Sequence, residues 1–483
     1  MRHRRLRRAL ALLAAAQLTV VLAACTGDSP PAGHTAGTTS RTPSGGTTAG
    51  TPGVSPLGAK WDMSRVTDFD SYLETLRGTT TFTELVWCDV EPQQGQRNWR
   101  QPDLVAKAAQ RHGITLDIKI RVGACWATGG EGQIVRGRKT ESAMPTDLAA
   151  YRSFVHDVVA RYKPMGVHTY AVENEVNSAS FWSGTPQQLI DLTTAAAAEV
   201  RATDPSAQVA DAGMSSTSYG YGIADQLLSE GKADQAVAAW NTYYARRIGT
   251  RGEQIPQVGS VDQLRTVLAS DQGKRNLAYL DVAQTLARTK VTDIRQVHFY
   301  EPWNAVPMFT AYLAGHTPAG HPVEAWEVGS FWKSADGTEQ ERAAEMTRTV
   351  ALLLAGGVRR VIWLPLATAA DNKHGQEIRY GLLDPTGAVR PAGVAMSSLV
   401  AASRGATVTP VSRSPLTGVA FESGGHTTMV VWSATGQTRL SLGPGSTAAA
   451  PGSSPSPVAG QTLTVGSTPV VATSAQPLSA VLP

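Results

Sequence analysis

The sequence has few cysteines, little net charge and no recognisable zinc-binding pattern. Its 483 residues include three cysteines, and 43 Lys and Arg against 39 Asp and Glu give a formal net charge of +4. Several of the positive charges lie in the first eight residues, so the rest of the chain is close to neutral. This balance implies neither a nucleic acid nor a membrane surface as a partner. No spacing of Cys and His predicts a zinc site, and we expect no metal.

The first 24 residues have the pattern of an export signal. A basic stretch, MRHRRLRR, precedes the apolar run ALALLAAAQLTVVLAA, which is short for a membrane span. Small residues then precede Cys25, and the run from Val21 to Cys25 resembles a bacterial lipobox, in which the cysteine is lipidated. The alternative is an ordinary cleaved signal with an incidental cysteine. We expect a cell-surface lipoprotein that is anchored to the membrane through Cys25.

Residues 25–55 predict a flexible tether. They are dominated by Ser, Thr, Gly and Pro, with almost nothing to bury.

If Cys25 carries the lipid, Cys88 and Cys125 remain as an even pair in an oxidising compartment. A disulfide between them and two buried thiols are both compatible with the sequence.

Residues 56–402 alternate short β-like runs with helical stretches. This alternation predicts a (β/α)8 barrel, also called a TIM barrel. A doubly wound sheet is the competing fold, but no glycine-rich phosphate loop follows any of the strands, so nucleotide binding is not indicated. The long connection between the fifth and sixth strands predicts an added helical subdomain. The predicted strands are 57–62, 83–90, 114–122, 167–174, 208–213, 296–300, 323–328 and 360–366.

Residues 403–483 lose the helical periodicity. Short β-rich runs separated by Gly, Ser and Pro predict a small β-sandwich appended to the barrel. Within it, residues 443–460 are rich in Gly, Pro, Ser and Ala and are expected to form a long flexible loop.

Two glutamates follow predicted barrel strands at the end where polar groups usually serve catalysis or binding. Glu175 follows the fourth strand and Glu327 ends the seventh. Two such carboxyls can face each other across a barrel mouth, one protonating a leaving oxygen while the other attacks an anomeric carbon. That division requires different environments, with one carboxyl kept protonated and the other ionised.

Ordered motifs across residues 56–402 resemble clan A of the glycoside hydrolases. The Asn174-Glu175 pair matches the clan's Asn-Glu at the end of the fourth strand, and Glu327 matches the nucleophile of the seventh. Residues 87–99 resemble the clan's W-x-x-x-E-P-x-x-G-x-x-x-W segment, and HFYEPW resembles the His-x-Tyr end of the sixth strand. RVIWLPL and the segment that begins YGLLDP resemble the eighth strand and the closing helix. The layout is most similar to families five and thirty-nine.

The resemblance implies a role for each matched residue. Glu175 would be the general acid/base and Glu327 the nucleophile of a retaining double displacement, with carboxyls about 5–5.5 Å apart. Asn174 would hydrogen-bond the sugar 2-hydroxyl, while Tyr300 would donate to Glu327. The remaining expected substrate-binding residues are His298, which would orient the site, Trp363 as the floor of the −1 subsite, and Glu91, Trp87 and Trp126.

Each assignment has a structural alternative. Glu175 and Glu327 could form buried ion pairs with Lys119 or Arg121. His298 and Tyr300 could fill the barrel core, and Trp363 could be a packing residue. For Glu91 and for Trp87, Trp99 and Trp126, sugar contact and packing are indistinguishable in sequence.

Three positions raise further questions. Glu173 competes with Glu175, because residues two apart on a strand face the same side, and only the preceding asparagine favours Glu175. Val176 stands where many clan members have Pro, and Trp326 where many have Thr. Trp326 could narrow the −1 pocket or pack outward.

The sequence therefore predicts an extracellular retaining glycoside hydrolase that acts on oligosaccharides or polysaccharides. Two carboxylates suffice for both half-reactions, so we expect no cofactor, and we expect a monomer. Two other classes of protein share some of these features: a two-lobed solute-binding lipoprotein, and a degenerate barrel that binds carbohydrate without cleaving it.

Overall fold

The computed structural model describes residues 47–61, 65, 68–129, 134–135, 138–139, 141–248, 255–333, 337–367 and 377–482. The expected signal peptide, Cys25 and most of the expected tether lie outside these residues. Thr48 exchanges backbone hydrogen bonds with Val408, at 2.9 and 2.8 Å. The folded chain therefore begins before residue 55, the expected end of the tether. Across the described residues, we find no helix with the length and apolar character that a membrane crossing requires.

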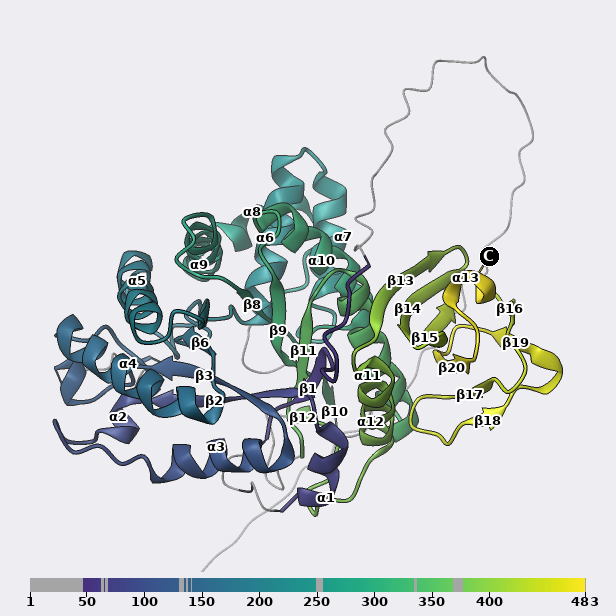
Figure 1. Ribbon diagram of the computed structural model, residues 1–483. Helices are drawn as coiled ribbons and strands as arrows, with labels where there is room; N and C mark the ends of the chain where they lie inside the picture. The colour runs from purple at the N-terminus through teal and green to yellow at the C-terminus, as the bar shows by residue number, and fades with distance from the viewer. Residues whose placement is uncertain are drawn as a thin grey trace, which may run out of the picture. The chain divides into compact units, whose positions relative to one another are not determined.

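A closed barrel of parallel strands forms the core of the molecule (Figure 1). Two four-stranded sheets, ordered β1-β11-β9-β8 and β2-β3-β6-β7, contribute its wall. Isolated parallel bridges from Ala210 to Ile294 and from Met214 to Val297 join β7 to β8. At the seam between β1 and β2, Ser55 N, just before β1, donates to Gly78 O, just before β2, at 2.9 Å. The barrel strands are β1 Leu57–Ala59, β2 Thr80–Val86, β3 Thr115–Arg121, β6 Thr169–Val172, β7 Gln208–Ala210, β8 Arg295–Phe299, β9 Val323–Val328 and β11 Arg360–Trp363.

The predicted TIM barrel is thus confirmed, and its single closed wall does not fit a two-lobed solute-binding protein. Helices follow the strands and cover the outside of the barrel. They are α1 Asp70–Leu73, α2 Trp87–Val90, α3 Arg100–His112, α4 Leu148–Tyr162, α5 Pro186–Thr203, α10 Val306–His316, α11 Glu339–Ala355 and α12 Pro391–Ser403. Two short antiparallel pairs are β4 Ile134–Val135 with β5 Arg138–Lys139, and β10 Phe331–Lys333 with β12 Glu377–Arg379.

The second strand differs from its predicted bounds. It begins at Thr80, and residues 87–90 form the helical turn α2 instead of the end of a strand. Trp87, Cys88 and Val90 are buried in this turn. A short apolar run that is buried looks the same in sequence whether it is a strand or a helical turn.

The long connection after β7 forms the predicted group of added helices: α6 Ser216–Ser229, α7 Ala233–Tyr243, α8 Val261–Leu268 and α9 Asp271–Arg288. One of them, α9, holds the loop that follows β6. Arg275 donates to the carbonyl oxygens of Val176, Asn177 and Trp182 at 2.8–2.9 Å. Asn276 Oδ1 accepts from Asn177 Nδ2 at 2.8 Å. This helix therefore fixes the chain on the C-terminal side of Glu175.

The C-terminal domain is antiparallel, as predicted. A six-stranded sheet, β13-β14-β15-β20-β17-β18, packs on a two-stranded sheet of β16 and β19 through apolar side chains such as Met429 and Leu440. The expected flexible loop at 443–460 contains β17 and β18, so that expectation was wrong. Its small side chains allow β17 to pair closely with β20. The strands are β13 Thr407–Arg413, β14 Leu416–Ser423, β15 His426–Ser433, β16 Thr438–Ser441, β17 Thr447–Ala449, β18 Ser456–Pro457, β19 Thr462–Val465 and β20 Val470–Ser474, followed by α13 Leu478–Val481.

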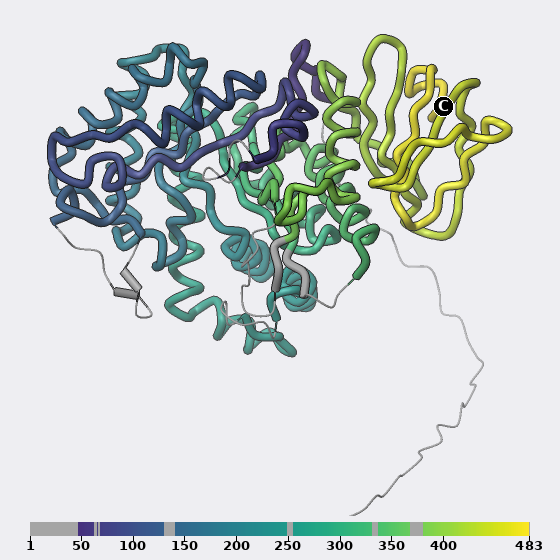
Figure 2. Tube along the Cα trace, turned by 90° about the horizontal axis from the view of Figure 1, so that it is seen from below, coloured from purple at the N-terminus to yellow at the C-terminus, as the bar shows by residue number. Residues whose placement is uncertain are grey.

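The second face of the six-stranded sheet packs on the barrel. Val419, Phe421, Val430 and Trp432 belong to the same buried apolar cluster as the barrel helices. The strands of this domain, green to yellow in Figure 2, lie beside α11, which contacts β13 and β14. One face of this sheet therefore extends the hydrophobic core of the barrel, while the other face forms a second core with β16 and β19.

Candidate active site

A β-bulge in β9 turns Glu327 toward the barrel mouth. Val297 pairs with Ala325, but the next residue of β8, His298, pairs with Glu327, so Trp326 is an extra residue in β9. A bulge of this kind places two successive side chains on the same side of a strand. Trp326 is fully buried among inward side chains such as Phe82 and Ala171. It therefore fills the barrel interior, which corrects both expectations for this residue.

The backbone around Asn174 is in an uncommon conformation. Glu173 and Glu175 both have positive φ, at 68° and 45°. This left-handed region is unfavourable for residues with a side chain and is concentrated at functional sites. Because β6 ends at Val172, the alternation of a strand does not apply beyond it. Glu173 and Glu175 consequently point to different partners, although they are two residues apart.

Glu173 belongs to the support of the site. Its Oε1 accepts from Val122 N at 2.7 Å and from Ser142 Oγ at 2.8 Å. Burial raises the pKa of Glu173, although the nearby Arg121 acts in the opposite direction. The side chain has no exposed surface, so Glu173 anchors the end of β3 and is not accessible to a ligand.

Two hydrogen-bond donors and an imidazole nitrogen surround the carboxylate of Glu327. Lys119 Nζ donates to Oε1 at 2.7 Å, and Tyr300 OH donates to Oε2 at 3.0 Å. His298 Nδ1 lies 3.6 Å from Oε2. Burial alone would raise the pKa of Glu327, but His298 and Lys119 outweigh it and hold this pKa well below its usual range. Glu327 is therefore ionised, as a nucleophile must be.

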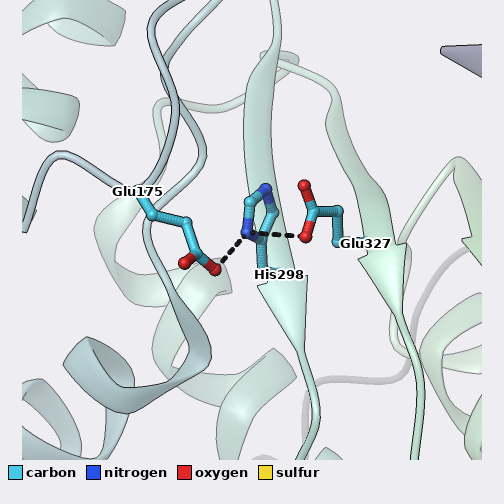
Figure 3. Close-up of side chains that lie close together, drawn as sticks. All are labelled: Glu175, His298 and Glu327. Carbon is cyan, nitrogen blue, oxygen red and sulfur yellow. Dashed lines mark hydrogen bonds and ion pairs between the residues drawn. The ribbon is translucent and has the colours of Figure 1, made fainter. Parts of the chain in front are cut away.

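His298 lies between the two glutamates (Figure 3). Its Nδ1 is 2.8 Å from Glu175 Oε1, and a carboxylate oxygen of Glu175 lies within 4.8 Å of one of Glu327. Glu175 comes from the loop after β6, whereas His298 and Glu327 come from strands. The side chain of Glu175 is 15% exposed, against 9% for Glu327, so the two carboxyls occupy different environments.

Lys119 also contacts Asn174. Lys119 Nζ donates to Asn174 Oδ1 at 2.6 Å. Because the ammonium group can only donate, it fixes the orientation of the amide and leaves Asn174 Nδ2 free to turn toward a ligand. The ion pair that the sequence offered as an alternative role for Glu327 is thus present, and it lies inside the same cluster as the catalytic candidates.

The donor atoms of Glu175, His298 and Glu327 are near enough to one another that the described residues could hold a metal ion there. The ammonium of Lys119 already occupies Glu327 Oε1 and would repel a second cation at short distance. The donor set therefore fits proton transfer and nucleophilic attack better than metal binding.

Trp87 and Glu91 do not present the surfaces that the expected sugar contacts require. Trp87 is 1% exposed and stacks on Phe154, and its Nε1 donates to Glu91 Oε2 at 2.9 Å. Glu91 is buried too and pairs with Arg97 at 2.6 Å. Both were predicted as substrate-binding residues, and the structure corrects this: their surfaces and hydrogen-bonding groups are taken up by the protein itself.

The other tryptophans divide between packing and partial exposure. Trp99 stacks on Phe154, and Trp363 is 2% exposed at the end of β11, which favours packing for both. Trp363 was expected to form the floor of the −1 subsite, but it presents almost no surface to a ligand. Trp126 keeps part of its surface exposed, while its Nε1 donates to Glu91 O at 2.7 Å. Trp126 and Trp99 are therefore the two of these tryptophans that keep surface available to a ligand, although each also packs on a neighbouring ring.

Sequence reasoning missed two residues of this site. Lys119 was considered only as an ion-pair partner, although its period-two spacing from Asp117 and Arg121 places it on the inward face of β3. Gly213 had no signal beyond the glycine itself. Its carbonyl accepts from Glu175 N at 3.0 Å, and a Cβ there would lie 2.6 Å from His298 Nε2.

Glycoside hydrolases are among the solved structures that share this arrangement of elements. A family 39 glycoside hydrolase from Bacteroides cellulosilyticus superposes with a TM-score of 0.57 at 14% identity, over 86% of this chain and 80% of the other. A monomeric β-xylosidase from Caulobacter crescentus gives 0.52 at 13% identity, over 88% and 97%. A family 30 endoxylanase from Clostridium papyrosolvens gives 0.50 at 12% identity, over 89% and 97%.

These similarities show the fold. No family model matches the sequence, and no curated protein matches it. The chain thus has the fold of TIM-barrel glycoside hydrolases, with a C-terminal antiparallel β domain.

Proposed function

We propose that this protein is a retaining glycoside hydrolase that acts outside the cell on oligosaccharides or polysaccharides. The observation that carries the proposal is the pair formed by Glu175 and Glu327, whose nearest oxygens lie within 4.8 Å. Retaining enzymes place their carboxyls about 5–5.5 Å apart, whereas inverting enzymes need about 6.5–9.5 Å to admit a water molecule. The short separation supports the retaining mechanism.

The surroundings of the two carboxyls support different roles. Glu327 is held ionised by Lys119 and accepts a hydrogen bond from Tyr300, so it serves as the nucleophile. Glu175 is more exposed and contacts His298, which makes it the group placed to exchange protons with the leaving oxygen and with water. In the first step Glu327 attacks the anomeric carbon while Glu175 protonates the departing oxygen. In the second step a water molecule gives its proton to Glu175 and displaces Glu327.

Asn174 supports the reaction by holding the sugar. With Oδ1 engaged by Lys119, its Nδ2 can donate to the 2-hydroxyl oxygen of the sugar in the −1 subsite. Such a bond strengthens in an oxocarbenium-like transition state. The resemblance of residues 21–25 to a lipobox supports export and anchoring through Cys25 as part of the same proposal.

Replacing either glutamate is expected to abolish most of the activity. Glu175→Ala should lower kcat on an aryl glycoside by about 10²–10⁴-fold, the usual contribution of general acid–base catalysis. The loss in kcat/KM, which reports the first step, should be smaller for an aryl group that leaves without protonation, whereas hydrolysis of the intermediate still needs Glu175 as the base. Glu327→Ala should lose activity with every leaving group, because no nucleophile remains. The measurement is steady-state release of the aryl group, on a sugar identified by screening wild-type protein against a panel of aryl glycosides.

Two controls accompany these variants. Glu230→Ala, at an exposed position at the end of α6, should retain wild-type activity. Proton NMR of the first product should show the anomeric configuration of the substrate. An inverted product would overturn the mechanism and leave the fold intact. A wild-type protein that binds sugars but cleaves none of them would favour the non-catalytic carbohydrate-binding alternative.

A further inference from the structure

Lys119 is a buried cation in the centre of the proposed catalytic cluster. Its side chain on β3 has no exposed surface. Its Nζ lies 2.7 Å from Glu327 Oε1, 2.6 Å from Asn174 Oδ1 and 3.3 Å from His298 Nε2. The same atom stands 4.4 Å from the centre of the Phe82 ring. A neutral amide, an imidazole and an aromatic face surround the ammonium. Glu327 is the only carboxylate bonded to it in the described part of the chain, while Glu84, opposite Lys119 on β2, acts on it only through its longer-range charge.

The charge of Lys119 therefore depends on the charge of Glu327. Removing one member of a buried ion pair leaves an uncompensated charge in a medium of low polarity, which is strongly unfavourable. Asn174, His298 and Phe82 offer dipoles and a ring face, but none of them supplies a full negative charge. Any step that neutralises Glu327 must raise the free energy of the site through Lys119.

The proposed retaining mechanism contains such a step. When Glu327 forms a bond to the anomeric carbon and the glycosidic C–O bond breaks, the leaving oxygen takes its proton from Glu175. The carboxylate of Glu327 has then become a neutral ester. When water attacks the same carbon, its proton passes to Glu175. The ester C–O bond breaks, and its electron pair returns to Glu327 as the carboxylate.

On the basis of that mechanism, we infer that Lys119 shortens the lifetime of the covalent glycosyl-enzyme. The ammonium stabilises the free carboxylate of Glu327 more than the ester, and it stabilises a transition state with partial charge on Glu327 to an intermediate degree. The free energy of the ester is thereby raised relative to that of the transition state for its hydrolysis, so hydrolysis is faster. Lys119 is a positioning residue, because its effect on the sugar is transmitted through the carboxylate of Glu327, to which it is bonded.

Removal of the ammonium should make the intermediate accumulate. Lys119→Met keeps the length of the side chain without its charge, and Lys119→Gln provides a second uncharged variant. Hydrolysis of the ester should slow on the order of tenfold. This factor assumes that the transition state has about half of the free energy that a hydrogen bond to a charged group contributes. Mixing with an aryl glycoside that has a good leaving group should then give a burst of aryl release. Mass spectrometry after acid quenching should show the protein with one glycosyl adduct.

The pH profile gives an independent readout. Without Lys119, the pKa of Glu327 rises, because a cation that favours the carboxylate is gone. The acidic limb of kcat/KM should move to higher pH in both variants. A purely structural role would lower the amount of active protein and would leave both the limb and the burst unchanged.

Two matched variants separate charge from other effects. Lys60→Met makes the same substitution at a lysine whose Nζ stands 5.2 Å from the same Phe82 ring. Lys60 also favours the ionised form of Glu327 but is not bonded to it, so this variant should accumulate much less adduct than Lys119→Met. Tyr300→Phe removes a neutral donor from the other oxygen of Glu327 and should lower activity with less accumulation than Lys119→Met.

The outcomes distinguish this inference from the proposed function. An active wild-type enzyme whose Lys119 variants show neither burst nor adduct would overturn the inference alone. Failure of both Lys119 variants to fold would overturn it as well, because the ammonium would then be structural. A wild-type protein that releases no aryl group from any glycoside of the panel would overturn the proposed function and the inference together.

Discussion

Gly213 is the residue at which the backbone and the catalytic side chains come closest together. Its φ is +64°, and an added Cβ would lie 2.6 Å from His298 Nε2 and 2.9 Å from the side-chain amide of Gln296. Both neighbours are fully buried, so neither can move away freely. A side chain at Gly213 must therefore displace His298, which joins Glu175 to Glu327.

Gly213→Ala should lower kcat/KM on the order of 10²-fold, which a displacement of about 1 Å can cause at a catalytic centre. The left-handed conformation should also lower the free energy of unfolding by about 1–2 kcal/mol. Steady-state kinetics and urea unfolding measure the two effects. Gly231→Ala is the matched control: its φ is +73° and nothing lies within 4 Å of the added Cβ, so it should reproduce the loss of stability without the loss of activity.

The site residues that could be predicted are those whose motifs fix both identity and place. Asn174, Glu175 and Glu327 were located by their positions after barrel strands, and the structure brings them together with His298 and Tyr300. The tryptophans could not be assigned, because stacking on a sugar and stacking on Phe154 require the same side chain. Glu173 could not be separated from Glu175, because positive φ after β6 is not visible in the sequence.

At the scale of elements, the disulfide joins two segments that frame the site. Cys88 in α2 and Cys125 after β3 are bonded, with Cα atoms 5.7 Å apart and a sequence separation of 37. Both elements end at the barrel mouth, next to Val122 and Glu173. The bond therefore limits the separation of the second and third strand ends in the unfolded chain as well as in the folded one.

The double variant Cys88→Ser, Cys125→Ser should lose about 2–4 kcal/mol of stability, as expected for a loop of this length. Urea unfolding of the mature proteins measures the difference. Wild-type protein kept in reductant should unfold like the double variant. Two free thiols in denatured, unreduced wild-type protein would contradict the bond.

Elements with strong periodicity could be predicted closely, and short apolar runs could not. Residues 323–328 form β9 with the predicted bounds, because Pro322 and Gly329 delimit this short β-prone run in the sequence. The bulge within that strand was invisible, since it depends on the pairing of His298 with Glu327 across β8. The turn α2 was predicted to be part of a strand for a related reason. Its apolar residues show that it is buried, but they do not show whether its backbone hydrogen bonds are those of a helix or of a strand.

At the scale of the molecule, the β domain and the barrel form one stability unit. Phe421 and Trp432 on the inner face of the sheet belong to the barrel's apolar cluster, and Trp432 packs edge-on against Trp303, with ring centres 6.3 Å apart. Arg348 of α11 lies over both rings, at 4.8 and 6.0 Å. The division at residue 403 predicted from composition is thus a change of architecture within a continuous core.

A chain that ends at Ser403 should consequently fold poorly. Without the sheet, the apolar surface of α11 that faces Phe421 and Trp432 would be exposed to water, and exposed apolar patches of this kind promote aggregation. The truncated protein should be recovered mainly in aggregates, and any soluble fraction should unfold at a lower temperature than the whole chain. Scanning calorimetry of the whole chain should show a single transition, because neither part can unfold without uncovering the other's core. Two separated transitions, or a truncated barrel as stable as the intact protein, would show instead that the β domain is an independent module.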